Sequence, residues 1–366
     1  MIFQFDIKNI ICKYMFDLKD VINLYNLNKD HQNNIKITNL NDIPNKYLIK
    51  LSQETIIPPT PSPLHSSDLQ KKFKFVKKLY AWNNKKINNV NHMKETLKEL
   101  YCGGYYCEID QNGINELKLI KLDIGYNKKI WNVNHMKETL KELYCRGDCG
   151  INQDGISELK LIVLDSYRNK KIKNVNHMRE TLKELNCDYE SGIDQNEINE
   201  LKLIKLSSLG NEKINNVNHM KENLKELDCG VDCGINQDGI SELKLVKLFA
   251  ASNTKIKNVN HMKETLEELN CGGLDCGIDQ NGISQLNLIK LNAYHNKKIT
   301  NVNHMKKTLK SLDCSFGSGI DQNGISELKL LKLNAYNNNK IKNVNHMKET
   351  LKEIVSGNYF GTYNLL

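Results

Sequence analysis

The chain has 366 residues, of which 39% are hydrophobic and 7% aromatic, which is low for a protein with one deep core. Its formal net charge of +9 is modest for this length and does not by itself indicate nucleic-acid binding. No stretch approaches the roughly 20 apolar residues of a membrane-spanning helix, and Asp6 and Lys8 interrupt the apolar N-terminus. We therefore expect a cytoplasmic protein whose 11 cysteines are not paired in disulfides.

Residues 1–56 do not follow the pattern of the rest of the chain, and residues 6–31 predict two short helices from apolar residues three or four positions apart. The segment resembles an F-box, in which a short helix is followed by an Asp-Leu-x-Asp step and a second helix that ends in Asn-Lys. The matching residues are Asp17, Leu18, Asp20, Val21, Ile22, Asn28 and Lys29, whereas Phe5 and Asp6 stand where the family usually has Leu-Pro.

The F-box resemblance implies docking on a Skp-type adaptor of a cullin ubiquitin ligase. The adaptor-binding residues that it implies are Ile10, Ile11, Leu18, Val21 and Leu24. The alternative is that residues 1–56 form a helical cap over the open apolar end of a repeat stack, which such stacks require.

Residues 57–69 form a separate segment that carries four of the five prolines in the chain, at Pro58, Pro59, Pro61 and Pro63, with Ser and Thr between them. Proline fixes the backbone in an extended conformation and cannot continue a helix. The composition predicts a stiff, exposed linker.

Residues 70–358 are built from a short repeat. The pentapeptide Asn-Val-Asn-His-Met occurs seven times, at intervals of 42 or 43 residues. A finer period of 21 or 22 residues begins at Val76 and divides the segment into about 14 units. A leucine opens each later unit: Leu97, Leu119, Leu140, Leu161, Leu182, Leu203, Leu224, Leu245, Leu266, Leu288, Leu309, Leu330 and Leu351. Residues 359–366 form a C-terminal tail.

Each unit predicts a short strand, because apolar residues such as Leu119, Leu122 and Ile124 point to one side of an extended backbone. The third inward position is usually small, as at Cys102 and Ser166, since a neighbouring coil must pack against it. In the odd-numbered units the ninth position is always asparagine, whose buried amide would bond backbone groups left free where the chain turns.

This pattern resembles the leucine-rich repeat. The resemblance implies an α/β solenoid, a horseshoe with a parallel β-sheet on its concave face. Apolar spacing predicts a turn or two of helix on the convex side of the even units and a tighter turn in the odd units. The Asn-, Lys- and Ile-rich composition and the near-identical paired repeats are similar to leucine-rich-repeat proteins of amoeba-infecting giant viruses, which implies the host cytoplasm as the location.

Leucine-rich-repeat proteins generally bind other proteins on the exposed face of the sheet, and the resemblance implies the same here. One outward column alternates lysine and glutamate, which predicts a self-neutralising ladder of ion pairs that carries little partner information. Exposed Tyr, Trp and Arg dominate binding hot spots, although repeat duplication alone could have scattered them. The predicted partner-binding residues are Tyr80, Trp82, Tyr101, Tyr144, Arg146 and Tyr167.

The chemistry-bearing residues recur with the repeat, which argues against an enzyme because a catalytic residue should be unique. Successive members of the inward cysteine column are two strand spacings apart, roughly 10 Å, too far for disulfides. A second set of four cysteines (Cys107, Cys149, Cys233 and Cys276) is expected to place one member of each pair in the core. The histidine column is expected to be capping or surface groups. We expect no metal, no cofactor, no specific nucleic acid and no membrane partner. The sequence favours a ligase substrate-recognition subunit, with a plain interaction scaffold as the alternative.

Overall fold

The computed structural model describes residues 76–356, which fall into two compact units, one ending at Asp165 and one beginning at Ser166. Every strand is short and parallel to its neighbours in the same unit. The strands of the first unit are β1 (Lys78–Tyr80), β2 (Glu99–Tyr101), β3 (Lys121–Asp123), β4 (Glu142–Tyr144) and β5 (Val163–Asp165). Those of the second unit are β6 (Glu184–Asn186), β7 (Lys205–Ser207), β8 (Glu226–Asp228), β9 (Lys247–Phe249), β10 (Glu268–Asn270), β11 (Lys290–Asn292), β12 (Ser311–Asp313), β13 (Lys332–Ala335) and β14 (Glu353–Ser356).

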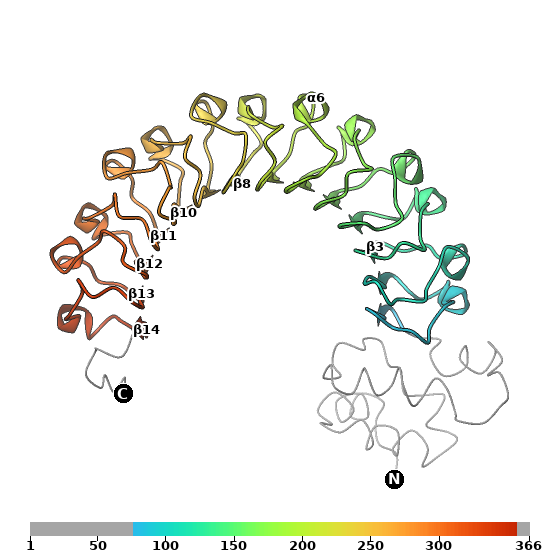
Figure 1. Ribbon diagram of the computed structural model, residues 1–366, viewed down its shortest axis with the longest axis horizontal. Coiled ribbons are helices and arrows are strands. Elements are labelled where there is room, and N and C mark those ends of the chain that lie inside the picture. The colour runs from blue at the N-terminus through green and yellow to red at the C-terminus, as the bar shows by residue number, and fades with distance from the viewer. Residues whose placement is uncertain (1–75, 357–366) are drawn as a thin grey trace, which may run out of the picture. The chain divides into compact units, whose positions relative to one another are not determined.

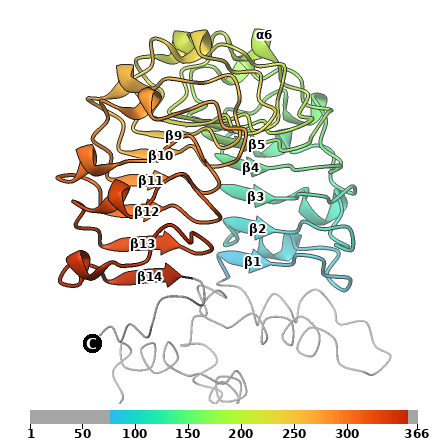
Figure 2. The ribbon, with the colours of Figure 1, turned by 60° about the vertical axis from the view of Figure 1, so that its left-hand side comes forward.

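Within each unit the strands pair in chain order, so that each repeat adds one rung to the sheet (Figure 1). The register places equivalent repeat positions side by side, as in Lys78 beside Glu99 and Tyr80 beside Tyr101. Figure 2 shows β10 to β14 as successive rungs of this kind. The predicted parallel sheet, with one strand for each repeat of 21 or 22 residues, is confirmed.

The chain between strands forms one turn of helix in each repeat, on the side of the unit away from the sheet (Figure 1). All but one are 3-10 turns: η3 (Asn91–Met93), η4 (Asn112–Ile114), η5 (Asn134–Met136), η6 (Asp154–Ile156), η7 (Asn176–Met178), η8 (Asn218–Met220), η9 (Asp238–Ile240), η10 (Asn260–Met262), η11 (Asn281–Ile283), η12 (Asn303–Met305), η13 (Asn323–Ile325) and η14 (Asn345–Met347). The one α-helical turn is α6 (Gln195–Ile198).

The expected difference between even and odd units is therefore wrong: both kinds make a single short turn. The one α-helical turn lies in the repeat that begins at Leu182, where Glu197 replaces the glycine found in the equivalent turns, such as Gly113 of η4. A Cβ at Gly113 would lie 2.1 Å from the carbonyl oxygen of Asn88, so glycine keeps the turn tight against the preceding segment.

The core is a narrow stripe of inward side chains shared by neighbouring coils. Leu119, Leu140 and Leu161 are completely buried, and their strands pair in sequence as β3, β4 and β5. The small third positions, such as Cys102, Cys145 and Ser166, are also buried. The leucines therefore line up along one apolar spine, as the repeat predicts.

Asparagine at the ninth position bonds the backbone as expected. The Asn127 Nδ2 donates to the carbonyl oxygens of Cys102 and Ile109, at 2.9 and 3.0 Å, while its Oδ1 accepts from the Lys129 N–H at 2.8 Å. Asn211, Asn253, Asn296 and Asn338 make the same contacts in the second unit. Each amide fastens its own turn to the preceding coil.

The predicted F-box-like segment 1–56, the linker 57–69 and the tail 359–366 lie outside the described residues, as do Ile10, Ile11, Leu18, Val21 and Leu24. In residues 76–356 no helix has both the length and the apolar character needed to cross a membrane.

Candidate partner-binding site

The exposed face of the sheet carries the predicted ladder of opposite charges. In the first unit Lys78 pairs with Glu99 at 3.0 Å and Lys121 pairs with Glu142 at 2.7 Å. In the second unit Lys247 lies 3.1 Å from Glu226. Because these pairs are partly exposed, each contributes only about 0–1 kcal/mol, and they leave little free charge for a partner.

Tyr80 and Tyr101 stack at the ends of β1 and β2, with ring centroids 4.3 Å apart and ring planes 14° from parallel. The Lys78 Nζ lies 5.2 and 5.1 Å from the two ring centroids, so this cation faces aromatic rings as well as Glu99. Register pairing of β1 with β2 brings these two predicted site residues together.

Tyr144 extends this arrangement at the end of β4. Its hydroxyl donates to Glu142 at 3.2 Å and accepts from the Lys121 Nζ at 3.3 Å. Burial alone would lower the pKa of Lys121, but hydrogen bonds to Glu142 and Tyr144 raise it above its ordinary value. Burial, and then the hydrogen bond to Glu99, raise the pKa of Tyr101 to about 12. Both groups therefore keep their protons at physiological pH, so this part of the sheet face presents tyrosine hydroxyl donors and lysine cations.

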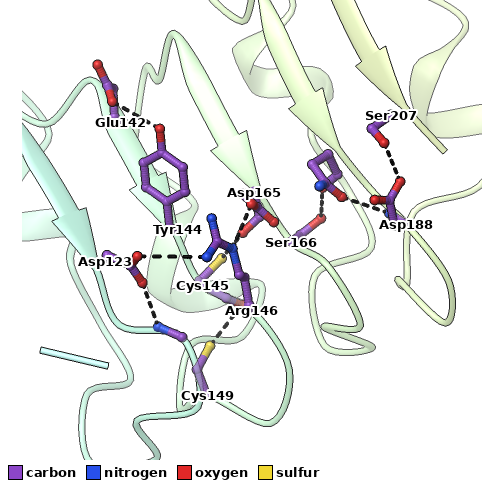
Figure 3. A network of polar contacts seen from close by, with 12 residues as sticks. Asp123, Glu142, Tyr144, Cys145, Arg146, Cys149, Asp165, Ser166, Asp188 and Ser207 are labelled. Atoms are coloured by element: carbon purple, nitrogen blue, oxygen red, sulfur yellow. Dashed lines mark hydrogen bonds and ion pairs between the residues drawn. The ribbon is translucent and has the colours of Figure 1, made fainter. Parts of the chain in front are cut away.

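Arg146 follows β4 and lies between two carboxylates from the neighbouring strands (Figure 3). Its Nε donates to Asp165 at 2.7 Å, and one terminal nitrogen lies 4.0 Å from Asp123. Both aspartates occupy outward positions of their strands, but each is only 8% exposed. Burial raises the pKa of Asp123, while the Gly125 N–H and Arg146 act in the opposite direction. Arg146 therefore neutralises the two acids and presents its guanidinium beside the Tyr144 ring, whose centroid is 5.1 Å away.

Trp82 lies over the backbone of the next coils and is 43% exposed. A Cβ on Gly103 would come within 2.2 Å of the indole, and one on Gly125 within 3.5 Å. The ring therefore fits only because Gly103 has no side chain. Neither these glycines nor the pairing of the two aspartates with Arg146 was predicted from the sequence. An aromatic residue one repeat before a glycine at the same repeat position was the available signal for the glycines.

Tyr167 belongs to the second unit. There it contacts Tyr189 edge to face at 5.6 Å, and the Arg168 guanidinium lies 5.3 Å from its ring. The structure thus brings Tyr80 together with Tyr101 and Tyr144 together with Arg146, and it places Trp82 on the same unit. It assigns Tyr167 to another aromatic pair.

The cysteine and histidine columns are structural. Both members of the Cys145 and Cys149 pair are buried, which corrects the expectation that only one would enter the core. The His135 Nε2 lies 3.1 Å from the Ile114 carbonyl oxygen and so donates to it, and burial lowers the pKa of this histidine. In the described range 76–356, no three His, Cys, Asp or Glu side chains are grouped to hold a metal ion.

Asp228, at the end of β8, allows a test of how burial of a carboxylate on the sheet face affects stability. Burial, with repulsion from Asp188, raises the pKa of Asp228 to about 6, whereas an Asp in an unfolded chain titrates near 3.8. The charged form is therefore unfavourable in the folded state. The resulting loss of stability is small below about pH 4, builds up between pH 4 and 6, and is complete above about pH 6. We expect Asp228→Asn to raise the free energy of unfolding by about 1–2 kcal/mol at pH 8 and not at pH 4.

Urea unfolding at the two pH values measures this difference. Asparagine already occupies the equivalent position at Asn270, where its Oδ1 accepts from the Gly272 N–H at 3.1 Å, so the replacement fits the turn. An equal gain at both pH values would show that the carboxylate charge is not the cause.

Comparisons with solved structures return several repeat proteins at low sequence identity. They include the yeast Rad7 and Elc1 complex, with 16% identity, coverage of 95% of this chain and 93% of that one, and a TM-score of 0.45. The TLR13–ssRNA13 complex has 14% identity, coverage of 76% and 52%, and a TM-score of 0.44. The functional domain of InlJ from Listeria monocytogenes, described as including a cysteine ladder, has 19% identity, coverage of 75% and 57%, and a TM-score of 0.37.

No family model matches the chain, and no curated protein sequence is significantly similar to it. The nature of the fold follows from the molecule's own features, which are one short parallel strand per repeat, buried leucines in register and the asparagine that closes each odd turn. The described chain is an α/β solenoid of the leucine-rich-repeat type.

Proposed function

We propose that this protein is a protein-interaction module that acts as a substrate-recognition subunit of a cullin-type ubiquitin ligase in the cytoplasm. The row of Tyr80, Tyr101, Tyr144 and Arg146 on the first unit is the observation that carries the binding role. Its side chains are already ordered by stacking, hydrogen bonds and ion pairs, so a partner would pay little entropy to immobilise them. The ligase link is supported by the F-box resemblance of residues 6–31.

The chemistry of this row favours a protein partner. Tyrosine and arginine provide large contact areas with a polar tip and are enriched in interface hot spots. The lysines and Arg146 are paired with carboxylates on the same face, which disfavours a polyanion as the main ligand. The proposed role is recognition, and the proposal includes no catalytic step.

Binding of the Skp-type adaptor tests the ligase link. We expect purified full-length protein to retain the adaptor in a pull-down, and the combined substitution Leu18→Ser and Val21→Ser to reduce retention at least about tenfold, because interface hot spots contribute around 2 kcal/mol each. Lys19→Ala is the matched control within the same segment. If the full-length protein does not retain the adaptor, the ligase role is wrong and the plain interaction scaffold, the second candidate, remains.

The sheet face is tested separately, by Tyr144→Ala. Once proteins captured by the full-length chain are identified by mass spectrometry, we expect this substitution to weaken the genuine partner by about 30-fold, as for a hot-spot residue. Tyr144→Phe keeps the ring and removes the hydroxyl that contacts Glu142 and Lys121, so it separates the two contributions. If Tyr144→Ala leaves the affinity unchanged, the partner does not bind this row.

A further inference from the structure

A second aromatic cluster lies beside the row just described, where the chain leaves β1, β2 and β3. We call it the aromatic edge, and it consists of Trp82, Tyr105, Tyr106 and Tyr126. Trp82 is 43% exposed, Tyr105 64% and Tyr106 60%, while Tyr126 is half-buried. Because parallel strands end at the same border of a sheet, the four side chains lie along one border of the first unit.

Two rings of this edge lie against glycines of the next coil. Trp82 covers Gly103, and Tyr126 covers Gly147, where a Cβ would lie 2.4 Å from the ring. Tyr105 contacts Tyr126 with centroids 5.2 Å apart. Each glycine therefore lets a ring lie against the backbone, which leaves an ordered aromatic surface exposed.

The backbone alone does not select these rings. Tyr126 has a φ of 64°, in the left-handed region that costs an ordinary residue roughly 1–2 kcal/mol. The equivalent positions hold a similar positive φ with glycine at Gly147 and Gly210 and with larger residues at Arg168 and Tyr189, so the turn accepts a ring without requiring one.

Charge around the edge points to an uncharged occupant. Lys129 pairs with Glu108, Lys128 lies 3.7 Å from Asp148, and Arg146 pairs with Asp165. These three cations are thus neutralised by acids of the same unit, and the Lys85 Nζ lies 4.5 Å from the ring centroid of Tyr106. A nucleic acid would need free cations for its phosphates as well as rings for its bases.

We propose that the aromatic edge binds residues 57–63 of this same chain, Ile-Pro-Pro-Thr-Pro-Ser-Pro, in the polyproline II conformation that their sequence favours. Proline-rich segments dock on aromatic surfaces because the extended helix is preformed and loses little entropy. Residues 55–64 contain no Asp, Glu, Lys or Arg, so their docking does not require a free charge at the edge. This inference does not depend on the proposed ligase role.

The length of the chain allows this contact. Pro63 precedes Val76 by 13 residues, which can span at most roughly 45 Å. Tyr126 follows the third strand, only about 10 Å along the sheet from β1. A short tether also gives an effective concentration on the order of 1 mM, so even a segment with weak intrinsic affinity would be bound most of the time.

Tryptophan fluorescence of the full chain tests the docking. The protein has two tryptophans, Trp82 and the exposed Trp131, so Trp131→Phe leaves Trp82 as the single reporter. In this parent we expect acrylamide to quench Trp82 weakly. Replacing Pro58, Pro59, Pro61 and Pro63 with serine should raise the quenching constant at least about twofold, since the tethered segment would no longer cover the indole for most of the time. Thr60→Ala with Ser62→Ala is the control, which keeps the prolines and should leave quenching as in the parent.

Addition of a synthetic peptide of residues 55–65 to the proline variant should restore protection, and the same peptide with serine for proline should not. Circular dichroism confirms that each variant keeps its fold. Equal quenching in the parent and the proline variant would overturn the proposal, as would a rise of the same size in the Thr60 and Ser62 control. Protection that falls on dilution of the parent would also overturn it, because docking within one chain is independent of concentration and docking between two copies is not.

Discussion

Asn253→Ala is expected to lower the free energy of unfolding by about 3 kcal/mol, because it leaves several buried backbone groups without partners. The Asn253 Nδ2 donates to the carbonyl oxygens of Cys229 and Ile235, at 2.7 and 3.1 Å. Its Oδ1 accepts from the N–H groups of Lys255 and Ile256, at 2.9 and 3.2 Å. Water cannot replace the amide easily, since the residue is only 2% exposed.

Urea unfolding measures the total effect, and hydrogen exchange locates it. Since each coil of a solenoid contacts only its neighbours, we expect faster exchange to be concentrated in the coils around β8, β9 and β10. Asn287→Ala, at an exposed position of the same compact unit, residues 166–356, is the matched control. It should change stability by less than about 0.5 kcal/mol. A loss at Asn253 no larger than at Asn287 would show that the asparagine ladder does not hold the coils together.

Gly239→Ala is the second substitution with a large expected effect, about 2–3 kcal/mol of lost stability, because it introduces an atom where the neighbouring backbone already lies. A Cβ at this position would be 2.1 Å from the carbonyl oxygen of Asn215, and a backbone atom cannot rotate away as a flexible side chain can. The Val217 N–H also donates to the Gly239 carbonyl oxygen at 2.9 Å, so a shift that relieves the clash would strain this bond.

Thermal and urea unfolding of Gly239→Ala, with Gly125→Ala as control, measure the effect. A Cβ on Gly125 would meet its nearest neighbour at 3.4 Å, an ordinary contact, so that variant should be nearly neutral. The equivalent position in α6 already carries Glu197, with the local chain wound as an α-helical turn. If Gly239→Ala costs under about 0.5 kcal/mol, then its coil can adopt the α6 geometry without penalty.

The strands, their register and their buried leucines could be predicted from the sequence, because a fixed interval of 21 or 22 residues places equivalent side chains next to each other in every coil. The asparagine contacts followed from the same repetition, since one amide position recurs where each odd turn begins. The turns opposite the sheet were less predictable. Apolar spacing around Val90 and Met93 fits a helix, but the chain must close each coil in few residues, and only a 3-10 turn of Asn91–Met93 forms.

The candidate site was predictable only in part, since repetition identifies which column a residue occupies but not what covers it. Asp123 and Asp165 occupy outward positions of β3 and β5, yet they are buried because Arg146, which follows the strand between them, lies against both. Likewise Trp82 could be identified as an outward residue, whereas its support by Gly103 depends on the shape of the adjacent coil. Which side chain covers a given residue depends on contacts between particular neighbours in adjacent coils. A single sequence does not reveal these contacts.

The alternation of lysine and glutamate along the second unit has a consequence for how such a molecule can change in length. Glu226 lies between Lys205 and Lys247, at 3.5 and 3.1 Å, so deleting one coil would bring like charges onto adjacent rungs. Deleting two coils, a segment of 42 or 43 residues, would leave each acid beside a base. Gain or loss of paired coils is therefore the electrostatically neutral step, and natural variants of different length should differ by whole pairs.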